Sequence, residues 1–204
     1  MGLVRAIGAA TALLGSVVGV HAETEQAKYR VVDQQDKFEL RAYEPAVVAE
    51  VRVEGDRDAA VNEGFRSLAA YIFGANVPGT SIAMTAPVTQ EAGQRIAMTA
   101  PVTQQGGKGN WTVRFIMPAG SRLATMPKPK DARVHLAEMP ARRIAAVRFS
   151  GLATDTSLAD QERQLDDWIA KRKLTPTGPA VFAYYDPPWT LPFLRRNEVL
   201  VPVR

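Results

Sequence analysis

The nine-residue stretch I-A-M-T-A-P-V-T-Q occurs twice without change, at residues 82–90 and again at residues 96–104. A short polar link that contains Gly93 separates the two copies. Within each copy Ile, Met, Ala and Val alternate with Ala, Thr, Pro and Thr, which is the period-2 pattern of a strand with one buried face. Two such strands joined by a short glycine-containing link predict a β-hairpin.

The register of this hairpin follows from its turn. A turn centred on Gly93 places Met84 opposite Val102, and it puts Met98 on the same apolar face. The proline in each copy has no N–H for the ladder, so we expect it at an edge or a bulge. A local duplication that only makes good hairpin sequence would explain the repeat equally well.

Other segments of the chain carry the same kinds of pattern. A helix is expected at residues 57–73, directly after Gly55 and Asp56. Its apolar residues Val61, Phe65, Leu68 and Ile72 share one face. A second helix is expected at residues 157–173, with Leu158, Leu165, Trp168 and Ile169 as its apolar stripe. Further strands are expected at residues 29–33, 38–43, 46–53, 111–117, 133–139, 142–149, 180–185 and 198–203.

A weaker internal similarity links two parts of the chain. A-E-V-R-V-E-G at residues 49–55 matches A-A-V-R-F-S-G at residues 145–151, and each copy is a strand that precedes a helix. Two related strand–helix–strand halves would form one α+β domain, with a large antiparallel sheet backed by two helices. Chance similarity over seven residues is the alternative.

The N-terminus and the composition limit where the protein acts. Residues 1–22 have a short charged start, an apolar stretch and small residues before Ala22, so we expect a signal peptide that is cleaved there. A retained anchor is the alternative. The expected mature protein, a single domain of residues 23–204, is then periplasmic or secreted, with a charge of 24 minus 21, or +3. This is a mild excess of positive charge, so nucleic-acid binding is not indicated.

The paired I-x-M-T-x-P-V segments resemble those of the SOUL haem-binding family. The resemblance extends over nearly all of the chain after the leader, through A-Y-I-F-G-A-N at 70–76, W-T-V-R-F-I-M-P at 111–118, P-K-P at 127–129, P-A-R-R-I-A-A-V-R-F-S-G at 140–151 and Y-Y-D-P-P-W-T-L-P-F-L-R-R-N-E-V at 184–199. It implies a twisted, barrel-like antiparallel sheet of two pseudo-repeated halves, flanked by two long helices. It also implies reversible, non-catalytic binding of haem b or another porphyrin.

Side chains that could ligate iron or catalyse a reaction are scarce. The chain has no cysteine, and His135 is the single histidine of the expected mature protein. Val134 and Leu136 share the opposite parity, so His135 is either an exposed strand residue or, as the minority interpretation, an axial ligand. Met98 lies on the apolar parity, where methionine usually fills a core. No nucleophile elbow, phosphate-binding loop or dinucleotide-binding motif occurs.

Two apolar surfaces with nearby cations are the candidate porphyrin site. They are one side of the first helix and the proline-rich loop at residues 186–196, and the resemblance places the family's haem site in these same regions. The expected binding residues are Phe65, Arg66, Ala69, Phe73, Trp189, Phe193, Arg195 and Arg196. Alternatively, Trp189 and Phe193 plug the end of the sheet and an arginine pairs with Glu198.

Three other functions remain open. A fold related to the effector-binding domains of bacterial regulators would bind amphipathic small molecules, and an acidic residue in the pocket would favour this. A protein-interaction module would use the proline–aromatic loop as its contact surface. An enzyme acting on tetrapyrroles would need an acid–base group, for which Tyr184, Tyr185 and Asp186 are the candidates.

Overall fold

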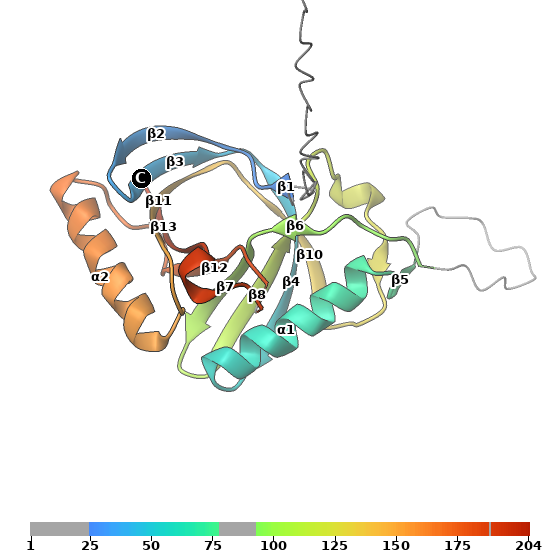
Figure 1. Cartoon of the computed structure of the whole chain (residues 1–204). Helices are drawn as coiled ribbons and strands as arrows, with labels where there is room; N and C mark the ends of the chain where they lie inside the picture. Colours follow the sequence, from blue (N-terminus) through green and yellow to red (C-terminus); the bar gives the residue numbers. More distant parts are fainter. Residues whose placement is uncertain (1–24, 78–92, 188) are drawn as a thin grey trace, which may run out of the picture.

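A single antiparallel sheet organises the molecule. The computed structural model describes residues 25–77, 93–187 and 189–204. Within these residues, nine strands pair in the order β10-β4-β8-β7-β12-β13-β11-β3-β2 and curl into a half-barrel (Figure 1). The strands are β2 (Tyr29–Gln35), β3 (Phe38–Tyr43), β4 (Ala46–Glu54), β7 (Val102–Gly107), β8 (Asn110–Ile116), β10 (Val134–Met139), β11 (Arg142–Phe149), β12 (Val181–Tyr184) and β13 (Asn197–Val203).

Two long helices lie on one face of this sheet (Figure 1). Helix α1 (Arg57–Ile72) packs on β4 and β8, and helix α2 (Asp155–Lys171) packs on β11 and β13. Each helix begins at a side chain that accepts a backbone N–H: Asp56 caps α1 and Thr154 caps α2. The α+β class with a barrel-like sheet and two helices, expected from the sequence, is confirmed.

Short elements complete the fold. They are β1 (Glu25–Gln26), β5 (Asn76–Val77), β6 (Thr99–Ala100), β9 (Lys128–Pro129), and the 3-10 helices η1 (Leu123–Thr125) and η2 (Pro192–Leu194). β1 pairs in parallel with β6, and β5 pairs antiparallel with β9. None of the described helices is long and apolar enough to cross a membrane. The expected signal peptide lies outside the described residues and stays a prediction.

The expected hairpin differs from the structure where it can be compared. Its first copy lies outside the described residues, but in the second copy Val102 has Phe115 of β8 on one side and Tyr184 of β12 on the other. Both ladder positions at Val102 are therefore filled, and the expected pairing with Met84 is wrong there. Met98 is 42% exposed, not buried. The alternation fails because Pro101 separates β6, which pairs with β1, from β7.

The core beneath α1 is built around close helix–sheet contact. Leu68 and Ile72 are buried, as the sequence predicts, and so are Ala60, Gly64 and Tyr71. Phe65 is not on this buried face but on its flank, because small residues at positions 60 and 64 let the helix axis approach the sheet. Under α2, all four expected stripe residues are buried, and Trp168 stacks on Phe38 with ring centroids 5.8 Å apart.

Gly64 supports a stability prediction. A Cβ at this position would lie 2.5 Å from Cγ2 of Val113, whose side chain is fully buried. Gly64→Ala should therefore lower the free energy of unfolding by about 1–3 kcal/mol, the usual cost of overpacking, although alanine favours a helix. Urea denaturation measures this change. Gly107→Ala, where the added carbon meets nothing within 4 Å, is the matched control; equal effects of the two substitutions would contradict the steric explanation.

The arrangement of strands has a regular order about its centre. Counted outward from the middle of the sheet, the strands on one side are β7, β8, β4 and β10, and those on the other side are β12, β13, β11 and β3. Along the chain, a helix follows β4 in the first set and β11 in the second. The internal repeat of two halves nevertheless stays a prediction. What matters for the site is that the two central strands, β7 and β12, lie between the helices.

Candidate functional site

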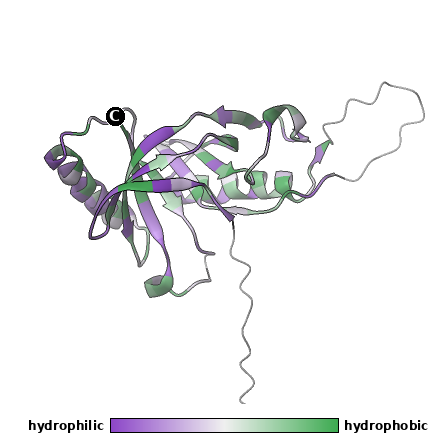
Figure 2. Cartoon of the chain, turned by 90° about the horizontal axis from the view of Figure 1, so that it is seen from above, coloured by the Kyte–Doolittle hydropathy of each residue, from purple (hydrophilic) through white to green (hydrophobic). Residues whose placement is uncertain are grey.

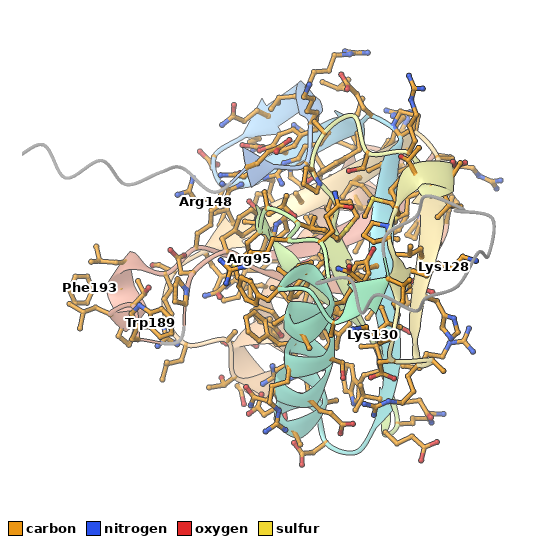
Figure 3. All side chains as sticks on the ribbon, turned by 90° about the vertical axis from the view of Figure 1, so that its right-hand side faces the viewer. Arg95, Lys128, Lys130, Arg148, Trp189 and Phe193 are labelled. Carbon is orange, nitrogen blue, oxygen red and sulfur yellow. The ribbon has the colours of Figure 1, made fainter. Side chains whose placement is uncertain are left out.

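The loop between β12 and β13 carries the largest exposed apolar side chains of the described residues. Trp189 is 83% exposed, Phe193 69%, Leu194 63% and Leu191 55%. Figure 2 shows the hydrophobic η2 segment projecting from the body, and Figure 3 shows Trp189 and Phe193 pointing away from the sheet. The alternative in which these two rings plug the sheet is therefore wrong. Contiguous exposed apolar surface of this kind usually marks a binding site.

Local contacts hold this loop in place. The backbone N–H of Gly151 donates to the carbonyl of Pro192 at 2.9 Å, and the Asn197 side chain donates to the carbonyl of Gly151 at 3.0 Å. The backbone N–H of Arg196 donates to the Asp186 carboxylate at 2.6 Å. The loop is thus tied to the segment that leads from β11 into α2. It presents its rings with little conformational entropy left to lose on binding.

The two loop arginines have different surroundings. Arg195 donates from Nε to the carbonyl of Thr190 at 2.7 Å, which stabilises the loop from within. Arg196 is paired with Glu198, at 2.7 Å from Nη2 to Oε1, and its guanidinium lies 3.9 Å from the centre of the Tyr185 ring. Arg196 therefore follows the alternative expectation, in which it pairs with Glu198.

Glu198 is the centre of a buried polar network beneath the loop. Arg41, 1% exposed, donates two hydrogen bonds to Glu198, 0% exposed, at 2.6 and 2.9 Å. The Tyr185 hydroxyl donates to the same carboxylate at 2.8 Å. Burial alone would raise the pKa of Glu198, but the hydrogen bonds and charges of Arg41 and Arg196 hold it below its usual value. The network fixes the start of β13 and hence one end of the loop.

The residues expected on the first helix lie on one flank of it. Phe65 packs edge-on against Phe115, with ring centroids 5.4 Å apart, and remains 39% exposed. Ala69 is half-buried, and both Phe73 and Arg66 are exposed. The opposite flank faces the start of β10, because Arg133, the residue before that strand, binds Glu63 and Ser67. Phe65 and Ala69 therefore face the side of β7, β12 and the second helix.

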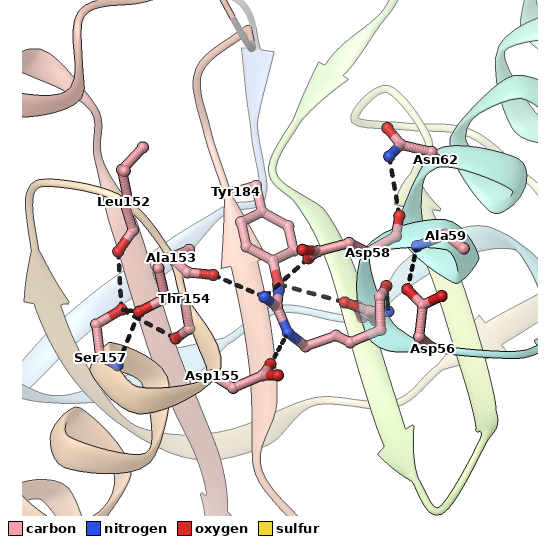
Figure 4. Close-up of polar contacts among 12 residues, drawn as sticks. Asp56, Asp58, Ala59, Asn62, Leu152, Ala153, Thr154, Asp155, Ser157 and Tyr184 are labelled. Atoms are coloured by element: carbon pink, nitrogen blue, oxygen red, sulfur yellow. Dashed lines mark hydrogen bonds and ion pairs between the residues drawn. The ribbon is translucent and has the colours of Figure 1, made fainter.

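Arg57 joins the N-termini of the two helices across the centre of the sheet. Its guanidinium pairs with Asp155, donates to the Tyr184 hydroxyl at 3.1 Å and to the carbonyl of Ala153 at 2.9 Å (Figure 4). The amide of Gln104 donates to the Arg57 carbonyl at 2.8 Å. Burial raises the pKa of Tyr184, so its hydroxyl stays protonated near neutral pH. These contacts tie the start of α1 to the start of α2 and to β12.

His135 lies apart from both apolar surfaces. It is exposed on β10, the edge strand, opposite Glu50 of β4, as the parity argument predicts. Among the described residues no group of three or more His, Cys, Asp or Glu could hold a metal ion. Its role as an axial ligand stays a prediction.

The sequence did not identify Arg57, Gln104 and Arg41, whose contacts hold the surroundings of the candidate site in place. Arg57 meets Asp155 98 positions away, and Arg41 meets Glu198 157 positions away. No local pattern in the sequence records such a pairing. For Arg41 the alternation of its strand gave no signal, because Arg41 shares the polar parity of Glu39.

The structure is an α+β half-barrel that carries two helices on one face of its sheet and an exposed apolar loop between β12 and β13. The family model for SOUL heme-binding protein matches residues 24–202. The chain therefore belongs to the SOUL heme-binding protein family.

Solved structures show the same fold at low sequence identity. The C-terminal domain of EcmrR is 15% identical with a TM-score of 0.58, over 86% of this chain and 98% of that chain. A hydrolase from Listeria innocua is 13% identical with a TM-score of 0.57, over 85% and 94%. EcmrR in a DNA complex is 15% identical with a TM-score of 0.56, over 82% of this chain and 57% of that one. No curated protein sequence matches the chain.

Proposed function

We propose that this protein binds haem b or a related porphyrin reversibly and without catalysis, between the loop at residues 186–196 and the flank of α1. The observation that carries the proposal is the exposure of Trp189 and Phe193 on a loop whose backbone is hydrogen-bonded in place. Membership of the SOUL family supports the ligand class. The expected leader would place this binding in the periplasm or outside the cell.

The proposed contact is mainly apolar. One face of the macrocycle would pack on Trp189 and Phe193, and its edge would meet Phe65 on α1 and Phe73 at the C-cap of that helix. Burying a few hundred Å2 at about 25 cal/mol per Å2 contributes several kcal/mol before the cost of association. That gain is compatible with micromolar binding.

The propionates need cations at the edge of this surface. Arg196 is already paired with Glu198, so we assign propionate pairing to Arg66, which is exposed on α1. Pairing of Arg195 with a propionate, expected from the sequence, stays a prediction. Arg196 then acts indirectly, by anchoring the loop. A guanidinium binds a carboxylate through two parallel hydrogen bonds, which would orient the ring.

Neither apolar surface contains a histidine, so iron ligation should contribute little to the affinity. Haemin and iron-free protoporphyrin should therefore bind with dissociation constants within a few-fold of each other, as followed by Soret absorbance and protoporphyrin fluorescence. His135→Ala should leave both values unchanged. Binding of haemin alone, lost in His135→Ala, would instead make His135 the axial ligand and contradict the apolar site.

A second candidate function is the binding of an amphipathic cation. An open groove of about 390 Å3 beside α2 is lined by Glu162 and Asp166 together with apolar residues such as Ile169 and Val201. Burial raises the pKa of both carboxyl groups, and each is also raised by an acidic neighbour. A fluorescent aromatic cation such as ethidium tests this candidate: saturable binding that Glu162→Gln abolishes, without porphyrin binding, would favour it over the porphyrin site.

A further inference from the structure

A cavity of about 100 Å3 lies at the end of the half-barrel where β11 begins. The cavity and the proposed porphyrin-binding surface lie at opposite ends of β11. Arg142, which lines the cavity, is the first residue of this strand, whereas the aromatic loop is hydrogen-bonded to Gly151, which lies beyond the last residue of the strand. The volume is several times what one water molecule needs. Its walls include the apolar residues Val47, Ile116 and Met117.

Arg142 is a partly buried residue in the wall of this cavity. Its Nη1 is buried and has no hydrogen-bond partner, and the side chain forms no ion pair with any residue in the described part of the chain. The guanidinium lies 5.5 Å from the centre of the Tyr43 ring, its cross-strand neighbour, which holds it in place. Burial lowers the pKa of Arg142, and the charge of Arg114 lowers it further.

A partly buried cation without a counter-charge is costly to stability, and buried polar atoms in proteins nearly always have a hydrogen-bond partner. A water molecule in the cavity would not balance the charge of the guanidinium. A carboxylate would satisfy both, because its two oxygens match the planar fork of a guanidinium.

We propose that this cavity binds the carboxylate of a small monocarboxylic acid of about two to four carbons, with Arg142 donating to its oxygens and the apolar walls covering its alkyl tail. The size limit follows from the cavity volume. The preference for a single negative charge follows from the other charged residues that line the cavity, which are Glu25, Glu44 and Lys28. Two carboxylates against one ammonium disfavour a second negative charge on the ligand.

Thermal unfolding in the presence of sodium butyrate tests the proposal. The unfolding midpoint of the wild-type protein should rise and saturate in the millimolar range, whereas sodium chloride and sodium succinate at equal ionic strength should not raise it in this way. In Arg142→Gln the apparent affinity for butyrate should fall at least tenfold. Arg143→Gln, the same change at the next residue, whose side chain is exposed, should behave like wild type.

Two outcomes would overturn the proposal: an equal rise with all three salts, or a butyrate response in Arg142→Gln that matches wild type. Because Arg142→Gln could fail to fold, NMR of the wild-type protein provides a second measurement. The methyl group of bound butyrate should show a nuclear Overhauser effect to the methyl group of Met117. Its absence at saturating butyrate would also overturn the proposal.

Discussion

Replacing Glu198 by glutamine is expected to lower the free energy of unfolding by about 3–5 kcal/mol, the usual cost of breaking a buried ion pair by removing one partner. The substitution leaves the charge of Arg41, which is 1% exposed, without its counter-charge. Urea denaturation at neutral pH measures the loss. Glu138→Gln, an exposed position on β10, is the matched control and should change stability by less than about 0.5 kcal/mol.

The same network predicts a dependence of stability on pH. Because the pKa of Glu198 is lower in the folded protein than its usual value of 4.5, its stabilising contribution is present above pH 4.5 and is lost as the pH falls through the folded-state pKa. The wild-type protein should therefore lose stability on acidification below about pH 4.5 more steeply than Glu198→Gln does. Equal slopes for the two proteins would contradict this role of Glu198.

The double substitution Trp189→Ala/Phe193→Ala is expected to weaken porphyrin binding by about 30- to 100-fold, or about 2–3 kcal/mol. Both rings are largely exposed, so their removal costs the folded protein little stability. The loss of affinity would therefore report contact with the ligand. Titration with haemin and with iron-free protoporphyrin measures it.

The control for this double substitution is Val31→Ala/Val32→Ala, which removes exposed apolar surface from β2 at the edge of the sheet. It should leave the affinity unchanged. If both double variants bound porphyrin as wild type does, the loop would not be the binding surface. If both weakened binding equally, the interaction would be non-specific.

Much of the fold could be predicted because its determinants are local. The periods of 3.6 and 2 in the apolar residues placed both helices within about two residues of their observed ends. They also identified the buried stripe of α2 and most strands of the sheet. The alternation of apolar residues in β10 also predicted that His135 is exposed to solvent.

The rest depends on contacts between residues far apart in the chain. The closeness of α1 to the sheet is set by Gly64 against Val113, and this made Phe65 a flanking residue. The predicted burial of Met98 was wrong because Pro101 interrupts the second repeat. The part before Pro101 pairs with β1, and the part after it pairs with β8. Arg196 could not be assigned to Glu198 or to a propionate until the buried position of Glu198 beside Arg41 was known.

We propose that a porphyrin packs on the ring of Trp189. Fluorine NMR of the protein labelled with 5-fluorotryptophan tests it directly, because the chain has only three tryptophans, Trp111, Trp168 and Trp189. Trp189→Phe assigns the relevant signal. On titration with iron-free protoporphyrin, the ring current should shift the Trp189 signal strongly and leave the buried Trp168 signal nearly unchanged. A Trp189 signal that does not move while the porphyrin binds would contradict the account.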